Sequence, residues 1–375
     1  NKKEEIICKI FEEILNVDKV GVRDSFFELG GHSLRATRLV NRIEVEIGGR
    51  ITLMEVFSNP TPEKLAKLTE EGMDEEYIPI PRAEEKEYYR MSSAQKRTYL
   101  IQQMDPKGIM YNMPYNYKLT GEIYPDRLKK ALDKLVARHE ILRTEFLMID
   151  GEAVQKIMDE ATVPFEYAES SEKSDEEEIR GFRRSFDLSK APQIRARLVK
   201  RDEYTLFMLD MHHIIGDGMS TGTFRRELNS LYRGEELPEL EHQFKDYSEW
   251  MNSRDLESQK EYWMDQFQEE APILDMPLDH VRPQLQSYEG RRTRMKLSEK
   301  LSTQIKELSK RNEVTEYMIF LSAAMILLSK YSRQEDIIIG SPISGRTHKD
   351  TEGMLGMFIN TLAMRGKPEK AKSCK

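Results

Sequence analysis

Two short runs of the sequence hold the residue types that could carry out chemistry. At 212–218, two adjacent histidines and an aspartate fall on one short turn between an apolar strand pattern and a helical pattern. A histidine at a strand end beside a tight turn can point into a cleft and change its charge near neutral pH. At 30–34, two glycines and a histidine lead into Ser33 at the start of another helical pattern. We therefore expect a site that handles protons or orients an acyl group, and a separate exposed serine that could feed it as a carrier.

Ser33 has two interpretations. Serine is a preferred N-cap residue, so Ser33 could simply cap its helix. The start of a helix also offers unpaired backbone amides and the positive end of the helix dipole, which favour an attached anionic group. Spacing alone favours the cap.

The paired histidines allow three interpretations besides acyl transfer. A metal site is disfavoured because no third ligand lies nearby, and open catalytic zinc sites usually keep three protein ligands. A nucleophilic triad is disfavoured because no serine or cysteine in a strand-to-helix elbow is evident. Two core histidines would be the commonest outcome for the pair taken alone. Acyl transfer without a covalent enzyme intermediate is the best chemical interpretation.

Composition limits the class of protein. A chain of 375 residues exceeds what one hydrophobic core usually serves, so we expect two or three domains. The 58 basic and 66 acidic residues give a net charge of −8, and no basic block could follow a phosphate backbone. Nucleic acid is therefore not an expected partner.

Several further features bear on location. The longest apolar stretch, 317–328, is too short to span a bilayer, and residues 1–20 lack the apolar segment of a signal peptide. Cys8 and Cys374 lie at opposite ends without companion ligands, so we expect neither a disulfide framework nor a metal site. These features favour a reducing cytoplasm and no membrane partner. The start at Asn1 and the loop-like 366–368 favour a piece of a longer polypeptide.

The first 87 residues predict a small domain and a linker. Apolar residues recur at helical spacing over 4–15 and 33–47, and short helices follow at 52–57 and 61–71. We expect a four-helix bundle over 1–71. Prolines and acidic residues then predict a linker over 72–87.

Helical and strand-like patterns alternate over the rest of the chain, which predicts an α/β body. The expected helices are 93–104, 125–139, 176–184, 219–232, 255–268, 298–311 and 315–331. The expected strands are 115–119, 141–149, 153–158, 194–200, 204–210, 291–297 and 336–340.

The context of Ser33 resembles a known family. The run 24–36, DSFFELGGHSLRA, resembles the modification site of peptidyl carrier domains in nonribosomal peptide synthetases, and the resemblance covers about 4–71. It implies that Ser33 carries 4'-phosphopantetheine, attached by a phosphopantetheinyl transferase, and holds an aminoacyl or peptidyl thioester. Tethering of this kind raises the effective concentration of substrate at a neighbouring site.

The histidine turn resembles the active-site motif of condensation domains, relatives of chloramphenicol acetyltransferase. Four other segments resemble further motifs of that family in the expected order: 92–97 (SSAQKR), 138–146 (RHEILRTEF), 244–250 (FKDYSEW) and 356–362 (GMFINTL). The resemblance implies a two-lobe α/β domain, with a first lobe over 88–255 and a second over 256–375. No run after Arg365 resembles the family's last two motifs, so we expect a truncated second lobe.

The resemblance implies that His213 faces both thioesters. The acceptor amine would attack the donor carbonyl, with His213 acting as a general base or as a group that positions the amine and stabilises the tetrahedral intermediate. The other residues would hold the site: His212 and Gly218 would shape the turn, and Asp217 would point away from the substrates and pair with Arg143. Asn360 would line the cleft near the crossover between the lobes, or serve as a turn residue.

The same resemblance implies a place in an assembly line. Thr221 follows Ser220 where epimerisation domains carry tryptophan, His32 precedes Ser33 where their carriers have aspartate, and cyclisation domains replace the histidines with aspartates, so condensation is favoured. A carrier of this type implies an L-configured donor. The implied partners are an upstream adenylation domain and a downstream carrier that holds the aminoacyl acceptor. The alternatives are a catalytically incomplete carrier and docking module, and an acyltransferase that acts on coenzyme A thioesters.

Overall fold

The computed structural model describes residues 1–31, 33–49, 51–71, 78–283, 290–312 and 314–369. The chain divides into two units. One unit contains Ile78–Asp255 and Ser344–Asn360, and the other contains Asn1–Tyr77, Leu256–Ile343 and Thr361–Lys375.

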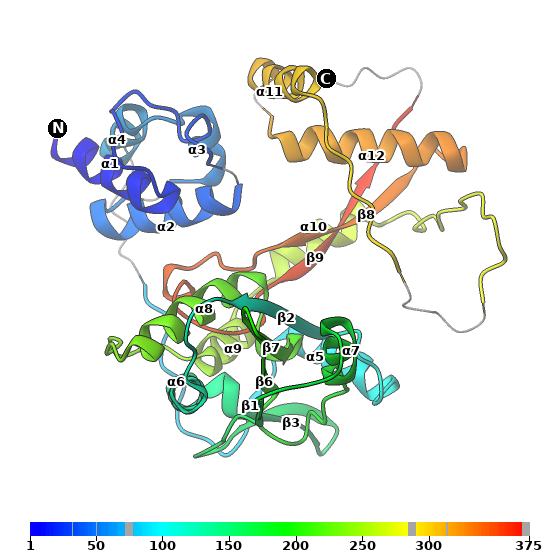
Figure 1. Ribbon diagram of the computed structural model, residues 1–375. Helices are drawn as coiled ribbons and strands as arrows, with labels where there is room; N and C mark the ends of the chain where they lie inside the picture. The colour runs from blue at the N-terminus through cyan, green and yellow to red at the C-terminus, as the bar shows by residue number, and fades with distance from the viewer. Residues whose placement is uncertain (32, 50, 72–77, 284–289, 313, 370–375) are drawn as a thin grey trace. The chain divides into compact units, whose positions relative to one another are not determined.

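The first 71 residues form four helices, shown in blue in Figure 1: α1 (Lys2–Leu15), α2 (Ser33–Ile47), α3 (Leu53–Ser58) and α4 (Pro62–Glu71). Capping boxes begin two of them, with Asn1 before α1 and Thr52 before α3. Their apolar faces share one buried core that includes Ile7, Ile10, Phe11, Phe26, Leu39, Ile43, Val56 and Leu65. The predicted helical bundle is confirmed, with bounds within two residues of those expected.

The largest sheet of the other unit has four strands in the order β2-β7-β6-β5. The strands are β2 (Asn112–Leu119), β5 (Phe165–Ala168), β6 (Ile194–Lys200) and β7 (Thr205–His212). The pairs β2–β7 and β7–β6 are antiparallel, and β5 lies parallel to β6. Every residue of β7 is buried, as expected for a strand covered on both faces. Because β7 ends at His212, this sheet places the histidine turn.

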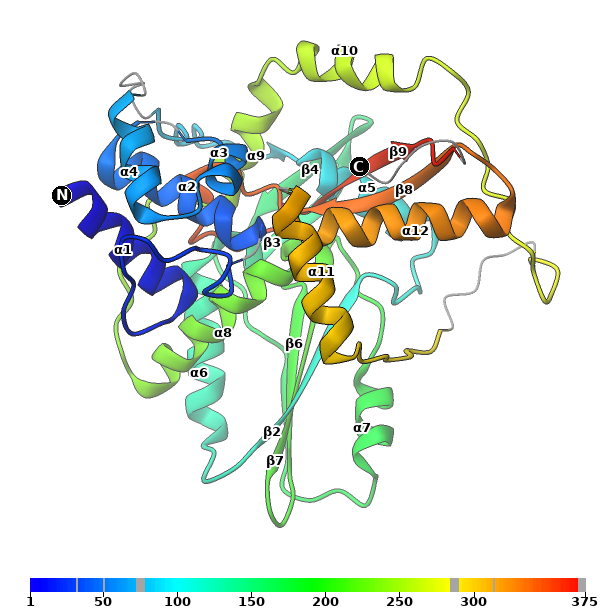
Figure 2. The same cartoon turned by 90° about the horizontal axis from the view of Figure 1, so that it is seen from above.

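Helices α5 (Ser93–Met104), α6 (Pro125–Arg138), α7 (Asp175–Phe182), α8 (Gly218–Arg233) and α9 (Phe244–Ser253) belong to the same unit. Figure 2 shows α6 and α8 on one side of the long strands and α7 on the other. A proline at its first turn begins α6, and a capping box at Ser174 begins α7. The four helices α5, α6, α7 and α8 lie within two residues of their predicted bounds, whereas α9 was not predicted as a helix.

A second sheet has the order β1-β4-β3 and contains β1 (Tyr89–Arg90), β3 (Thr144–Ile149) and β4 (Glu152–Ile157). The predicted strand 141–149 begins late, because Glu140–Arg143 forms a 3-10 turn. The Thr144 hydroxyl donates to the Glu140 carbonyl at 2.7 Å and closes this turn. The strand therefore begins only where the chain leaves the turn.

The segment 344–360 packs against the first part of its unit. A Cβ added to Gly356 would lie 1.9 Å from the Phe244 ring, so the backbone approaches α9 more closely than any side chain permits. The rings of Tyr247 and Phe358 lie 4.6 Å apart. Asp350 accepts a hydrogen bond from the Ile80 amide at 2.8 Å, which holds residues of the predicted linker on the same unit. The predicted domain boundaries, and the truncation of the second lobe, stay predictions.

The remaining elements are α10 (Glu257–Gln266), α11 (Glu299–Asn312), α12 (Glu316–Ser332) and a two-stranded sheet of β8 (Ile337–Ile343) and β9 (Asn360–Gly366). The predicted strand 291–297 is wrong, because this basic, exposed run pairs with no strand in the described part of the chain. Strands β5 and β9 were not predicted. No single helix among the described residues has the length and hydropathy to span a bilayer, although the bent pair α11 and α12 would together meet those two criteria.

Candidate active site

The histidine turn joins β7 to α8. His212 is the last residue of β7, His213–Ile215 forms one 3-10 turn, and Asp217 caps the first turn of α8. The Asp217 carboxylate accepts from the Ser220 amide at 2.8 Å, as an N-cap residue does. The strand end and the helix start therefore fix both ends of a loop only a few residues long.

His212 is fully buried and holds the turn from within. Its Nδ1 accepts a hydrogen bond from the Ile214 amide at 3.1 Å, and its Nε2 lies 3.2 Å from Gln102 Oε1. Burial, with a further contribution from His213, lowers the pKa of His212 to about 3. A neutral imidazole fixed in this way fits the predicted role in shaping the turn.

His213 is the histidine of the pair that keeps contact with solvent, since its side chain is only partly buried. Its backbone amide donates to the Tyr111 carbonyl at 2.8 Å, which anchors the residue on the chain leading into β2. Among the described residues, His213 Nδ1 has no hydrogen-bond partner. In the described part of the chain, no carboxylate therefore orients this ring as one orients the base of a nucleophilic triad.

Asp217 is buried, and the prediction that it pairs with Arg143 is wrong. Its carboxylate lies 3.5 Å from Arg346 Nη2 and accepts a hydrogen bond from the Phe358 amide at 3.1 Å. Arg143 instead donates to the carbonyls of Met158 at 2.8 Å and of Ala137 at 2.7 Å. Arg143 is thus used to satisfy free carbonyls at the end of α6, a common place for a basic side chain.

Arg346 is a buried residue that sequence reasoning missed. Its guanidinium donates to the Met354 carbonyl at 3.0 Å and to Ser220 Oγ at 2.8 Å, and it stacks on the Phe358 ring at 3.8 Å. Burial lowers the pKa of Arg346, although the Asp217 carboxylate opposes that effect. Arg346 therefore ties segment 344–360 to the loop that carries the histidines. No local pattern marks an arginine between Gly345 and Thr347 as buried.

We expect Asp217→Ala and Arg346→Met each to destabilise the protein by about 3–5 kcal/mol, because each leaves one member of a buried charged pair without its partner. Thermal or denaturant unfolding measures the effect. Arg233→Met is the matched control, since Arg233 pairs with Glu235 on the surface and is 66% exposed. A variant of either residue that unfolds at the same temperature and denaturant concentration as the wild type would contradict this expectation.

The structure gives the positions of two other predicted site residues, but it does not test their roles. Gly218 is the first residue of α8, and open space surrounds the point where a Cβ would lie, so its role in shaping the turn stays a prediction. Asn360 begins β9 and accepts a hydrogen bond from Arg97 Nη2 at 2.6 Å. Its predicted place in the substrate cleft also stays a prediction.

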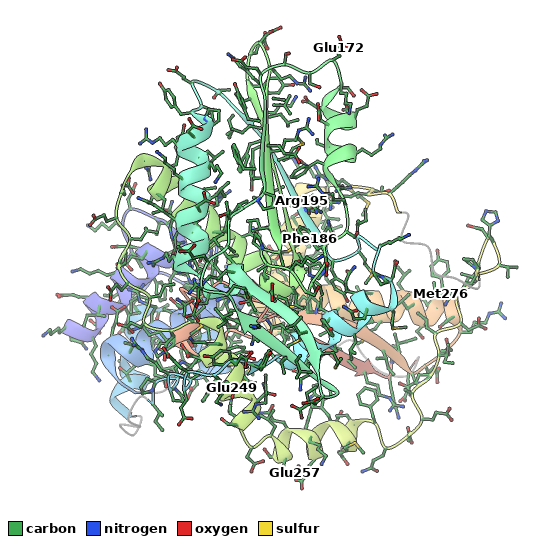
Figure 3. All side chains as sticks on the ribbon, turned by 90° about the horizontal axis from the view of Figure 1, so that it is seen from below. Glu172, Phe186, Arg195, Glu249, Glu257 and Met276 are labelled. Atoms are coloured by element: carbon green, nitrogen blue, oxygen red, sulfur yellow. The ribbon has the colours of Figure 1, made fainter. Side chains whose placement is uncertain are left out.

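A buried ion pair that the sequence did not reveal lies beside the turn. Arg195 on β6 donates from Nη2 to Asp210 on β7 at 2.6 Å, and its guanidinium lies 3.9 Å from the Phe186 ring (Figure 3). That ring in turn contacts His212 with its edge, 6.0 Å between centroids. Burial raises the pKa of Asp210, opposed by Arg195. In the sequence, the sign of this buried pair is Asp210 itself, an aspartate within the apolar run LFMLDM.

The backbone of Ser33 begins α2, a helix of 15 residues, as predicted, whereas the neighbouring His32 lies outside the described residues. The preceding loop is tightly packed: a Cβ added to Gly31 would lie 2.3 Å from the Phe26 ring. The Gly31 amide also donates to the Phe26 carbonyl at 2.8 Å. A serine at a helix start, preceded by a fixed glycine loop, fits a phosphodiester through the helix amides and dipole.

Comparison with known proteins gives two family matches. Residues 85–375 match the condensation domain, and residues 5–69 match the phosphopantetheine attachment site. Within the described residues, no group of three or more potential ligands is placed to hold a metal ion.

Two curated relatives and one solved structure are also similar. The chain is 43% identical to bacitracin synthase 3 of Bacillus licheniformis over 375 residues, which is 98% of this chain and 6% of that protein. It is 41% identical to tyrocidine synthase 2 of Brevibacillus parabrevis over 375 residues, which is 99% of this chain and 10% of that protein. The condensation domain of Monacolin K polyketide synthase has a TM-score of 0.64 at 22% identity, covering 75% of this chain and 68% of its own.

Proposed function

Because this chain belongs to the condensation domain family, preceded by a phosphopantetheine attachment domain, we propose that it forms a peptide bond between two carrier-bound substrates. The amine of an acceptor aminoacyl thioester attacks the carbonyl of the donor thioester. A C–N bond forms, the C–S bond of the donor breaks, and the amine proton ends on the released thiol. The observation that carries the proposal is His213, a partly exposed imidazole on a turn that the buried residues His212 and Asp217 hold at its two ends.

His213 would act on the attacking amine. Its ring has no carboxylate partner among the described residues that would hold one tautomer, and no serine or cysteine nucleophile is needed for a direct attack. It could remove the amine proton as a general base, or hold the amine and stabilise the tetrahedral intermediate. Asp217 and Arg346 act behind it, by fixing the loop.

Ser33 would hold the donor. When attached there, 4'-phosphopantetheine supplies a long flexible arm that ends in the thiol of the thioester. The residues of this chain contribute a hydroxyl for the attachment and helix amides for the phosphate.

The proposal also names partners. A phosphopantetheinyl transferase would modify Ser33, an upstream adenylation domain would supply the donor, and a downstream carrier would present the acceptor. The chain spans only a small part of both curated relatives above, which are synthases of much greater length, and this supports such an assembly. We also propose that the donor amino acid is L-configured and that the protein is located in the cytoplasm.

Dipeptide formation on a separate carrier tests the function. A phosphopantetheinyl transferase would load this chain from an L-aminoacyl coenzyme A, and a second carrier would be loaded with a different amino acid. We expect mass spectrometry to find a dipeptide on the second carrier. A loaded chain that keeps its aminoacyl group and yields no dipeptide would favour a carrier and docking module.

A further inference from the structure

Helix α5 buries polar side chains on the face that packs into its unit. Gln95, Thr98 and Gln102 are 0%, 1% and 4% exposed, whereas Leu100 and Met104 are 51% and 86% exposed. The three polar residues share one face because they are spaced at i, i+3 and i+7. Burying a polar group costs free energy unless it forms hydrogen bonds. The hydrogen-bond partners of these polar side chains therefore indicate why they are buried.

Gln102 forms hydrogen bonds with both ends of its amide. Its Nε2 donates to the carbonyls of Asp105 at 3.1 Å and Gly108 at 3.2 Å. These two acceptors use both amide protons and fix the orientation of the group, since a carbonyl can only accept. The Gln102 oxygen must therefore face the opposite way, where it lies 3.2 Å from His212 Nε2.

The Gln102 oxygen and the Ile214 amide together determine where His212 carries its proton. His212 Nδ1 accepts from the Ile214 amide at 3.1 Å, so Nδ1 is not protonated. The proton of the neutral ring is then on Nε2 and is donated to Gln102 Oε1. The opposite tautomer would set two donors against each other at Nδ1 and two acceptors at Nε2.

A second residue of the same face reaches the turn. Gln95 Nε2 lies 3.4 Å from the carbonyl of Ile214, and the Gln95 oxygen accepts from the Ser92 amide at 3.0 Å. The amide of Ile214 is thus held through His212 and Gln102, and its carbonyl is held by Gln95. Ile214 is the residue directly after His213, so α5 constrains the backbone that presents the reactive ring.

We propose that Gln102 is a positioning residue for peptide-bond formation, which fixes His212 as the Nε2-protonated tautomer and so holds the turn that presents His213. The inference rests on the proposed function only for its effect on rate. The hydrogen-bond relay from Gln102 to Ile214 stands on the geometry of the unit alone. Gln102 itself would touch neither substrate.

The test replaces Gln102 by methionine, which keeps the length of the side chain and removes its hydrogen bonds. We expect kcat for dipeptide formation to fall by up to about 10²-fold, as small displacements of a reacting group can cost. We expect the KM for the acceptor carrier and loading at Ser33 to stay unchanged. Gln103→Met is the matched control, because Gln103 is the exposed neighbour on the same helix, and it should retain the wild-type rate.

Nitrogen NMR of His212 gives a readout that a general loss of stability would not produce. The wild type should show the Nε2-protonated tautomer. Gln102→Met should show a mixture of tautomers, or changed chemical shifts of the His212 ring nitrogens. Gln102→Glu should raise the pKa of His212, because a carboxylate beside Nε2 favours the imidazolium. An Nδ1-protonated His212 in the wild type, or an unchanged kcat in a folded Gln102→Met, would overturn the inference. If the wild type forms no dipeptide, the proposed function fails while the NMR result still decides the relay.

Discussion

Replacing His213 by alanine is expected to lower the rate of dipeptide formation by about 10²- to 10⁴-fold, the usual contribution of general acid–base catalysis. The fold should survive, because the ring is partly exposed and its Nδ1 bonds to no described residue. The backbone hydrogen bond from His213 to the Tyr111 carbonyl does not depend on the side chain. The rate is measured by mass spectrometry of the acceptor carrier, at saturating acceptor.

The pH dependence of the rate separates the two roles of His213. A general base gives the wild type a pH-dependent limb that disappears in His213→Ala, whereas a positioning group lowers the rate by the same factor at every pH. His280→Ala is the control, since His280 is an exposed histidine outside this unit. A His213→Ala variant with nearly the full rate would argue against either role and favour the docking module.

The parts of the fold that could be predicted are those in which local chemistry decides the outcome. Helix α5 begins at a capping box of Ser92 and Gln95, and α6 begins at Pro125, so local start signals place the first residue of both helices. The histidine turn was placed correctly because an apolar strand, a glycine and a helix start follow one another within a few residues. In each case the determining residues are neighbours in sequence.

The parts that could not be predicted depend on contacts between distant segments. Asp217 pairs with Arg346 rather than Arg143, and no spacing rule links a loop residue to an arginine far along the chain. The polar face of α5 shows the same limit, because a periodic pattern assigns glutamine and threonine to the solvent side. Gln95 and Gln102 are buried instead, since each meets an unpaired group of the histidine turn.

Replacing Ser33 by alanine is expected to abolish attachment of phosphopantetheine, because alanine offers no hydroxyl to take up the phosphate. Intact mass before and after incubation with coenzyme A and a phosphopantetheinyl transferase measures this: the wild type should gain one increment and Ser33→Ala none. Ser25→Ala is the matched control, since Ser25 precedes the same glycine loop and should leave loading intact. A folded wild type that gains no increment would contradict the carrier role.

Ser33→Ala also separates the carrier from the catalytic unit and from the helix-cap interpretation. Dipeptide formation from the chain's own carrier should stop, whereas a donor supplied on a separate carrier should still react, because His213 and its supports lie in another unit. If Ser33 only capped α2, the substitution to alanine would instead lower the stability by about 0.5–2 kcal/mol and leave both routes equally active. Loss of the first route with retention of the second would therefore show that the serine contributes its hydroxyl to the chemistry, and the helix start its amides.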